Sequence, residues 1–377
     1  MRLFALLLTG CLGATGSLGA ASLTIASPVP RQVIQRTGFV PADAWGQHEG
    51  GPALGSARVS IRSAITDRKP PTERWQARAV PIGRAFGRGI GWTDVTATVS
   101  ADQVEVAVDI PAGGWYRIEL KSGPLAASVE PVGIGDIFLI AGQSYAANTG
   151  EEKFAIDDPE GRVVALDLRT NSWATANDPQ PAVLGGNGGS LWPNAMNLLM
   201  PLARVPIGLV NVAVGGTAVG QWLPGEVLVV AGKSFTLHRD LVAGGAAVGR
   251  FRAVLWQQGE SDVLANTSTA VYQQRLNQVV SRAAAEWGFH PPWMLAKSTC
   301  HPTVYMRPAQ EAVIRDALQQ LMRQPDFLPG PDTDILCEVG VYRAPMGTRR
   351  HFSGPGQRAA GKMWFATLWN AFYAASK

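Results

Sequence analysis

Three places in the chain combine an apolar run with polar or glycine residues soon after it. Ser144 follows the run DIFLIA and a Gly-Gln pair, Gly215 follows IGLVNVAV, and Gln258 follows RAVLW and another glutamine. A serine hydroxyl is a nucleophile, glycine lets a backbone N–H approach a ligand closely, and a side-chain amide donates hydrogen bonds. A nucleophile and donors for an oxyanion are two of the three parts that acyl transfer requires.

The third part is a base, because an un-ionised serine is a poor nucleophile without one. His351 lies in RRHFSG, just before the last helical pattern, and is the candidate. A lone histidine is more often structural, and a serine at the start of a helix is often only its N-cap. From its own stretch, Ser144 fits a cap better than a nucleophile, but the other strand ends shift the balance towards catalysis.

The elements that would position these residues follow from the apolar pattern after Gly135. DIFLIA, IGLVNVAV, RAVLW and WMLAKS are apolar on both faces, as buried parallel strands are. Helical patterns lie between and after them, including residues 357–373 near the C-terminus. Strands that alternate with helices predict a three-layer α/β domain with a parallel sheet over residues 132–377. Ligands bind at the carboxyl ends of such strands, which is where Ser144 falls.

The chain before this domain has a different pattern. Residues 22–131 contain short alternating segments such as ARVSIRSAI and VEVAVDIP, separated by glycine and proline. Period-two alternation between turn residues predicts antiparallel strands, here a small β-sandwich of Ig-like or jelly-roll-like type. This segment holds no convincing catalytic cluster, so the chemistry is expected in the second domain.

Residues 1–21 have the composition of a signal peptide, with one early arginine, an apolar core and a small-residue end. The sequence therefore predicts export to the periplasm or the extracellular space. The letters LTGC, ending at Cys11, also resemble a bacterial lipoprotein box, which would make Cys11 a lipid anchor. No later segment has the roughly 18 to 20 unbroken apolar residues that cross a bilayer.

Cysteine usage and charge exclude several other kinds of site. After the leader only Cys300 and Cys337 remain, and the sequence leaves open whether they pair or are separate buried thiols. Neither C-x-x-C nor H-E-x-x-H occurs, so no metal or organic cofactor is expected. The net charge is +4, but lysine and arginine are scattered, which favours ordinary solvation over nucleic-acid binding.

Four blocks in the second domain resemble those of the SGNH hydrolase superfamily, specifically its sialate O-acetylesterase-like carbohydrate esterases. They are GDIFLIAGQS, VGGTAVGQWLP, WQQGESD and RHFSGPG, in this order, and the resemblance covers roughly residues 135–370. It implies a flavodoxin-like three-layer hydrolase domain, and a preceding β-sandwich also occurs among such proteins. It further implies an exported serine esterase that removes O-acetyl groups from a carbohydrate through an acetyl-serine intermediate, without a cofactor.

The resemblance also implies roles for individual residues. Ser144 would attack the ester carbonyl, and His351 would take the serine proton and return it to the leaving sugar hydroxyl. The oxyanion would be stabilised by the N–H groups of Ser144 and Gly215 and by the amide of Gln258. Further residues would organise the site or bind the sugar: Gln143, Gly216, Thr217 and Glu260 for the first role, and Trp192 and Trp222 for the second.

The chain departs from the family pattern next to the histidine. Relatives usually carry Asp three residues before it, in D-x-x-H, and here that position is Thr348. In Ser-His-Asp enzymes, losing this carboxylate lowers turnover by about 10⁴-fold, because the imidazole is no longer held in the right tautomer. Three explanations stay open. A backbone carbonyl orients His351, a carboxylate from another loop does so, with Asp262 and Asp334 as candidates, or the protein binds an acetylated glycan without hydrolysing it.

Two further departures lie beside the expected pocket. Gln257 stands where some relatives have histidine, and Tyr145 replaces the asparagine that often follows the serine. Both put the substrate preference in doubt and leave the nucleophile unchanged. Arg349 and Arg350 adjoin His351 and, if they point towards it, disfavour its protonated form.

A lipase or thioesterase of the same superfamily is a weaker alternative, since the sequence shows no obvious lid.

Overall fold

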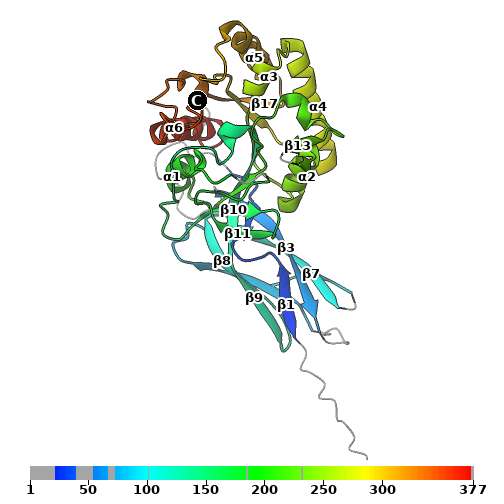
Figure 1. Cartoon of the computed structure of the whole chain (residues 1–377). Helices are drawn as coiled ribbons and strands as arrows, with labels where there is room; N and C mark the ends of the chain where they lie inside the picture. The colour runs from blue at the N-terminus through cyan, green and yellow to red at the C-terminus, as the bar shows by residue number, and fades with distance from the viewer. Residues whose placement is uncertain are drawn as a thin grey trace, which may run out of the picture.

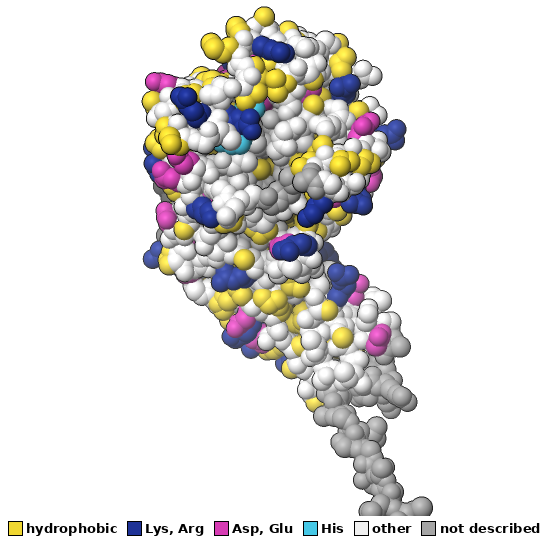
Figure 2. Space-filling view, viewed as in Figure 1, with side chains coloured by type: hydrophobic (Ala, Val, Ile, Leu, Met, Phe, Trp, Pro, Cys, Tyr) yellow, Lys and Arg dark blue, Asp and Glu magenta, His cyan; other side chains and the backbone are white. Residues whose placement is uncertain are grey.

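The computed structural model describes residues 22–39, 54–66, 73–100, 102–183, 186–230 and 232–374. The predicted leader over residues 1–21, with Cys11, lies outside these residues. Figure 1 shows a β-rich part formed by the N-terminal strands and a larger part in which helices flank a sheet. In Figure 2, acidic and basic side chains are scattered over the visible face without a large patch of one sign.

The N-terminal part is a sandwich of two β-sheets. One sheet has the strand order β1-β3-β7-β6, and the other is formed by β5, β4, β8 and the first half of β9. Along β3, Ala57, Val59 and Ile61 are buried and alternate with exposed residues. This alternation places one apolar face between the sheets, which confirms the predicted sandwich. The strands are β1 (Leu23–Ser27), β3 (Ser56–Ile65), β4 (Gln76–Ile82), β5 (Ile90–Asp94), β6 (Ala97–Val99), β7 (Gln103–Pro111), β8 (Gly114–Ser122) and β9 (Leu125–Gly142).

The second part is built on a mostly parallel sheet. Its strand order is β11-β10-β12-β9-β15-β16-β17, and within this path β10 and β11 form an antiparallel pair. The apolar runs of the sequence form β9, β12, β15 and β16, which confirms the predicted parallel strands. The additional strands are β10 (Val163–Asp167), β11 (Ser172–Thr175), β12 (Ile207–Asn211), β15 (Ala253–Gln257), β16 (Trp293–Lys297) and β17 (Phe327–Asp332).

The two parts share β9, which runs through both of them. The expected domain boundary between residues 131 and 132 falls inside this strand. The short strand β2 (Val33–Gln35) from the N-terminal part also pairs with β9, in parallel. The strand that leads to Ser144 is therefore hydrogen-bonded to elements of both parts.

Helices cover both faces of the central sheet, as the sequence predicts (Figure 1). Phe138 and Ile140 of β9 pack in the core on the side of α1 and α6, whereas Ile137 and Leu139 pack in the core under α2, α4 and α5. None of the described helices is both long and apolar enough to cross a bilayer. The helices are α1 (Trp192–Ala203), α2 (Leu237–Val248), α3 (Glu260–Leu264), α4 (Thr269–Trp287), α5 (Pro308–Leu321) and α6 (Gly354–Phe372).

Short elements lie in the loops between these helices and strands. They are the single turns η2 (Ser144–Ala146), η3 (Val219–Trp222) and η4 (Thr333–Ile335), and the hairpin strands β13 (Leu228–Val230) and β14 (Lys233–Phe235). The last helix, α6, begins three residues before the predicted start. Ser353 is its N-cap, and its Oγ accepts a hydrogen bond from the Gly356 N–H.

A buried ion cluster links the N-terminal part to the central sheet. Asp136 of β9 is fully buried, and its carboxylate accepts hydrogen bonds from Arg36 (2.7 Å), Arg252 (3.0 Å from Nε) and the Tyr373 hydroxyl (2.8 Å). Burial alone would raise the pKa of Asp136. The charges and hydrogen bonds of the two arginines outweigh burial and hold this pKa well below its usual range. The cluster thereby fixes β9 shortly before it reaches Ser144.

Candidate active site

Ser144 lies at the carboxyl end of β9, in the middle of the central sheet. β9 ends at Gly142, whose φ of +124° suits glycine alone, and a Cβ there would collide with the Gln257 carbonyl oxygen. The Gln143 N–H donates to that same carbonyl (2.9 Å), and Ser144 then opens η2. Gln143 occupies the N-cap position of this turn, so a capping role for Ser144 is wrong. The serine is 6% exposed, at the edge where ligands bind.

Two backbone N–H groups next to the serine have no acceptor in the described part of the chain. Gly215 follows β12, and a Cβ built on it would lie 3.6 Å from the Ser144 Cβ, so the two residues are neighbours. The Val214 N–H donates to the Gly142 carbonyl (2.9 Å), which joins the two strand ends. Within the described residues, neither the Ser144 N–H nor the Gly215 N–H donates a hydrogen bond. Such N–H groups are suited to stabilising an oxyanion.

The Gln258 side chain joins three of the strand-end loops. It is fully buried, and its Nε2 donates to Asp262 Oδ2 (2.7 Å), Thr217 O (3.0 Å) and Gln143 Oε1 (3.2 Å). Its Oε1 accepts a hydrogen bond from the Tyr272 hydroxyl (2.9 Å). The amide hydrogens of Gln258 therefore already have protein acceptors. This geometry assigns Gln258 to the support of the site and does not favour the predicted role as an oxyanion donor.

Gln143 and Thr217 belong to the same hydrogen-bond network. Gln143 Oε1 also accepts the Ser261 N–H (3.2 Å), so two donors hold the amide in one orientation. Thr217 Oγ1 donates to the Val214 carbonyl (2.9 Å), and Gly216 between them has a φ of +75°. The sequence predicts that these residues organise the site, and the structure brings them together at the expected edge of the sheet.

Glu260 is fully buried at the start of α3. Its Oε1 accepts a hydrogen bond from the Ser298 hydroxyl (2.7 Å), and its Oε2 accepts one from the Gly259 N–H (3.1 Å). Burial raises the pKa of Glu260 to about 8, so the carboxyl is largely neutral at pH 7. These contacts fix the end of β16 against α3, which is an organising role.

The structure corrects the suggestion that Asp262 or Asp334 replaces the missing triad acid. Asp262 accepts hydrogen bonds from the Val219 N–H (2.8 Å), from Gln258 and from a threonine hydroxyl. Asp334 accepts hydrogen bonds from the N–H groups of residues 299 and 300, at 2.6 and 2.8 Å, and from Arg315. Both carboxylates are occupied by backbone and side-chain donors that include groups of neighbouring loops and helices, and neither is hydrogen-bonded to His351.

His351 is half-buried in the loop before α6. Its Nδ1 lies 3.3 Å from the Thr348 hydroxyl oxygen, and its ring meets the Tyr145 ring edge-on at a centroid distance of 6.0 Å. The imidazole therefore contacts the residue that follows the nucleophile candidate. Ser144 Oγ and the imidazole share no direct hydrogen bond within the described structure. Burial, followed by the charges of Arg350 and Arg343, lowers the pKa of His351 to about 4, so the ring is neutral at pH 7.

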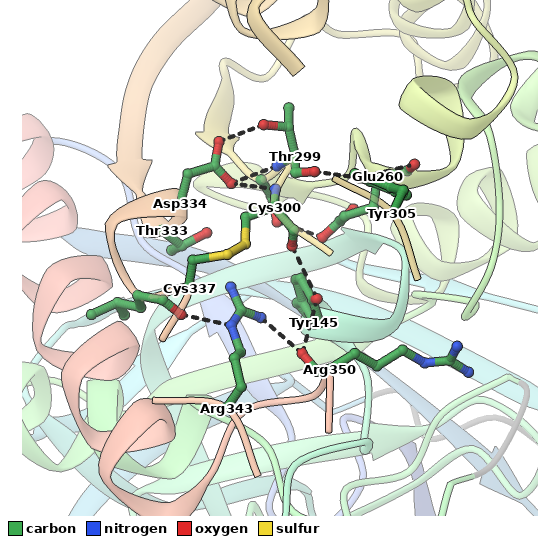
Figure 3. Close-up of a disulfide and its surroundings, with 12 residues drawn as sticks. Tyr145, Glu260, Thr299, Cys300, Tyr305, Thr333, Asp334, Cys337, Arg343 and Arg350 are labelled. Carbon is green, nitrogen blue, oxygen red and sulfur yellow. Dashed lines mark hydrogen bonds between the residues drawn. A yellow bond between two sulfur atoms is a disulfide. The ribbon is translucent and has the colours of Figure 1, made fainter. Parts of the chain in front are cut away.

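Tyr145 and Arg343 hold the histidine loop against the serine turn (Figure 3). Arg343 is not among the residues that the sequence predicts for the site. The Tyr145 hydroxyl lies within hydrogen-bond distance of the Cys300 and Arg350 carbonyls, at 3.1 and 3.0 Å. Arg343 is fully buried, with its guanidinium 4.3 Å from the Tyr145 ring centroid and 4.2 Å from that of Phe352. It also donates to the Arg350 carbonyl (3.2 Å). No short motif predicts this arrangement, because Tyr145 and the histidine loop are about 200 residues apart in the sequence, as its contact with the Arg350 carbonyl shows (a separation of 205 residues).

Cys300 and Cys337 form a disulfide next to this cluster (Figure 3). The bond links the loop after β16 to the chain that follows η4, across a separation of 37 residues. The Cys300 carbonyl lies within hydrogen-bond distance of the Tyr145 hydroxyl, so the disulfide fixes a neighbour of the serine turn. The structure thus settles the pairing that the sequence left open.

Removing the disulfide is expected to destabilise the protein and to weaken the site. We expect the double variant Cys300→Ala, Cys337→Ala to lose about 3 to 4 kcal/mol of unfolding free energy, the entropic value for a loop of this size. Urea unfolding measures this loss. A reductant should lower the stability of the wild type and leave the double variant unchanged. Equal stability of the oxidised and reduced wild type would contradict a structural role.

The structure also corrects the assignment of Trp192 and Trp222 to the sugar site. Both are fully buried and have no surface for a ligand to stack on. Trp192 Nε1 donates to the Ala146 carbonyl (2.8 Å), and its ring packs on Trp364 at 5.3 Å. Trp222 Nε1 donates to Thr217 Oγ1 (3.2 Å). The two indoles support the loops of the site from inside the core.

A comparison with one solved structure agrees with this fold. A solved carbohydrate acetylesterase structure from Xanthomonas citri superposes with a TM-score of 0.56 and 15% sequence identity, covering 91% of this chain and 73% of that one. A structure of a protein from Arabidopsis thaliana covers 63% of this chain and 98% of its own, with a TM-score of 0.49 and 18% identity.

The sequence comparisons concern the second part of the chain. A probable carbohydrate esterase of Arabidopsis thaliana is 27% identical over an alignment of 172 residues, and the match covers 40% of this chain and 63% of that protein. The chain thus spans less than two thirds of that curated relative. A family model described as "Carbohydrate esterase, sialic acid-specific acetylesterase" matches residues 134–321, the segment that carries Ser144, Gly215 and Gln258. Through this segment the chain belongs to that family of carbohydrate esterases, with the fold of the SGNH hydrolases.

Proposed function

We propose that this protein is a serine esterase that removes O-acetyl groups from a carbohydrate. The observation that carries the proposal is the position of Ser144 after the end of a central strand, where its own N–H and that of Gly215 have no acceptor among the described residues. This position lies in the segment that belongs to the carbohydrate esterase family. The proteins named in the comparisons as carbohydrate acetylesterase and probable carbohydrate esterase support the same reaction class.

In the proposed mechanism, Ser144 Oγ attacks the acetyl carbonyl while His351 Nε2 takes the serine proton. The N–H groups of Ser144 and Gly215 stabilise the tetrahedral oxyanion. When the intermediate collapses, the sugar hydroxyl leaves with the proton from His351, and the acetyl group stays on Ser144. A water molecule then gives its proton to His351 and attacks the acetyl-serine, so that acetate leaves and the serine is restored. No metal or organic cofactor takes part in these steps.

The protonation state of His351 supports its role as the base. A base must be unprotonated at the working pH, and the lowered pKa of about 4 keeps the imidazole neutral throughout the neutral range. The charges of Arg350 and Arg343 disfavour the imidazolium that forms during attack. The lowered pKa implies that His351 is unprotonated throughout the neutral range and is a comparatively weak base.

We also propose that the protein acts outside the cytoplasm. The leader-like residues 1–21 support export, and the Cys300–Cys337 disulfide fits an oxidising compartment, where such bonds persist. In a second version of this proposal, the exported protein is attached to a membrane by a lipid on Cys11. The substrate is then an acetylated glycan met in the periplasm or outside the cell.

Acetate release from a panel of acetylated glycans tests the proposed function. The panel holds acetylated xylan, pectin, peptidoglycan and sialic acid, each incubated with the residue 22–377 protein and with its Ser144→Ala variant. We expect release above the variant on at least one substrate. If the folded wild type releases no more acetate than Ser144→Ala on every substrate, the esterase proposal is wrong. Retained glycan binding would then favour a binding protein with this fold.

A further inference from the structure

We infer that the Thr348 hydroxyl positions the His351 imidazole by accepting a hydrogen bond from its Nδ1–H. This inference rests on the proposed function, in which the other ring nitrogen, Nε2, takes the serine proton. Thr348 Oγ1 and His351 Nδ1 lie 3.3 Å apart. A hydrogen bond accepted from Nδ1–H leaves Nε2 unprotonated, which is the tautomer that a base next to serine requires. A neutral hydroxyl thus stands where the family pattern has an aspartate.

The loop that carries both residues is held from several sides. The Thr348 carbonyl accepts a hydrogen bond from the Thr303 hydroxyl (2.9 Å), which links the loop to the segment after the disulfide. The Ala344 N–H donates to the His351 carbonyl (2.9 Å). Between the two residues, Arg349 has a φ of +56°, so the chain turns there. The contact between hydroxyl and ring therefore belongs to a loop with defined anchors at both ends.

No described carboxylate competes with Thr348 for the imidazole. Asp262, Asp334 and Glu260 each accept a hydrogen bond from another loop of the site, from the Val219 N–H, the Cys300 N–H and the Ser298 hydroxyl respectively. Among the described residues, the His351 ring has Thr348 as its hydrogen-bond partner. The backbone-carbonyl explanation that the sequence allowed is therefore replaced by a side-chain hydroxyl.

The groups around the ring explain what a hydroxyl does differently from a carboxylate. His351 faces the Tyr145 ring, and the cations of Arg343 and Arg350 and the imidazole of His301 lie close enough to interact with it electrostatically. A carboxylate among these groups would stabilise the imidazolium by charge. A hydroxyl fixes the tautomer and orientation but adds no negative charge. The inferred arrangement is a triad in which Thr348 orients the His351 imidazole but adds no negative charge to stabilise the imidazolium.

Three substitutions at residue 348 separate orientation from charge. Thr348→Val removes the hydroxyl at nearly constant shape, and we expect kcat to fall by about 10-fold, the worth of one hydrogen bond, with KM little changed. Thr348→Ser keeps the hydroxyl and should keep most of the activity. Thr348→Asp should raise kcat and move the acidic limb of the pH profile of kcat/KM upward by about one unit, because a carboxylate raises the pKa of the imidazole. Thermal unfolding of each variant checks that the fold is retained.

The tautomer itself can be measured without any turnover. In ¹⁵N-labelled protein at pH 7, the ring nitrogens of His351, assigned with a His351→Gln variant, should show the proton on Nδ1. Thr348→Val should reduce this preference, and Thr348→Ser should retain it, while the signals of His301 stay unchanged.

The outcomes distinguish this inference from the proposed function. If the wild type releases no acetate, the esterase proposal is wrong. The ¹⁵N signals of the His351 ring still decide whether Thr348 sets the tautomer of the imidazole. Unchanged signals in Thr348→Val, or a proton on Nε2 in the wild type, would overturn the inference. So would a Thr348→Val variant with wild-type kcat, or a Thr348→Ser variant as impaired as the valine.

Discussion

Replacing Ser144 by alanine is expected to lower kcat for acetate release by about 10⁴-fold or more, because removing the nucleophile of a serine hydrolase has an effect of this size. Only the N–H groups of Ser144 and Gly215 and the binding contacts would remain to assist the reaction. The measurement is kcat on the best substrate of the panel, at enzyme concentrations high enough to detect residual turnover. Rapid quenching of the wild type should also yield protein with one added acetyl group, and the variant should not acquire it.

Ser63 provides a matched control for this substitution. It is a buried serine of β3 in the N-terminal sandwich, 2% exposed, and its hydroxyl has no hydrogen-bond partner among the described residues. Ser63→Ala should therefore keep the wild-type kcat. A Ser144→Ala variant with more than a tenth of the wild-type activity would exclude the acetyl-serine mechanism, even if acetate is released.

The strand ends of the second domain were predictable because their signals are local. Apolar runs on both faces identify buried parallel strands, and the carboxyl edge of such a sheet collects whatever follows them. Ser144, Gly215 and Gln258 come together for this reason. The sequence also shows the loss of the aspartate at residue 348, although only the structure shows the threonine hydroxyl beside the histidine ring.

The predictions that the structure corrects concern residues whose surroundings depend on contacts between distant segments. Trp192 and Trp222 look like surfaces for a sugar in the sequence, but their indoles are enclosed by helices and strands from elsewhere in the chain. Asp262 and Asp334 look available because a sequence does not show which backbone N–H groups will occupy a carboxylate. Arg343 has no local signal, since its aromatic partners come from the serine turn and from the far side of its own loop.

The positions of the carboxylates have a consequence for the electrostatics of the site. Asp262 and Asp334 are hydrogen-bonded to other loops, and the groups that interact electrostatically with the His351 imidazole include Arg343, Arg350 and the neutral His301. Burial and positive charge therefore keep the imidazole of His351, the proposed base, neutral. Its loops are positioned by hydrogen bonds and by the disulfide, without an acid at the histidine.

The second large effect is expected in stability, from the buried cluster at Asp136. Replacing Asp136 by asparagine keeps the shape but leaves Arg36, which is fully buried, and Arg252 without their carboxylate. Breaking a buried pair in this way costs about 3 to 5 kcal/mol, because a charge stays in the interior uncompensated. Urea unfolding of the wild type and of Asp136→Asn measures the difference.

Asp109→Asn is the matched control, because it removes a carboxylate from the exposed pair with Arg58, whose side chains are 64% and 66% exposed. Its expected cost is at most about 1 kcal/mol. The pH dependence gives a second test. Since the pKa of Asp136 in the folded protein lies below that of an unfolded aspartate, about 3.9, its contribution is fully present above that pH and is lost as the pH falls below it. The difference between wild type and Asp136→Asn should therefore be constant from pH 5 to 8 and shrink in more acidic solution. If Asp136→Asn is no less stable than Asp109→Asn at pH 7, the cluster does not secure the strand that leads to Ser144.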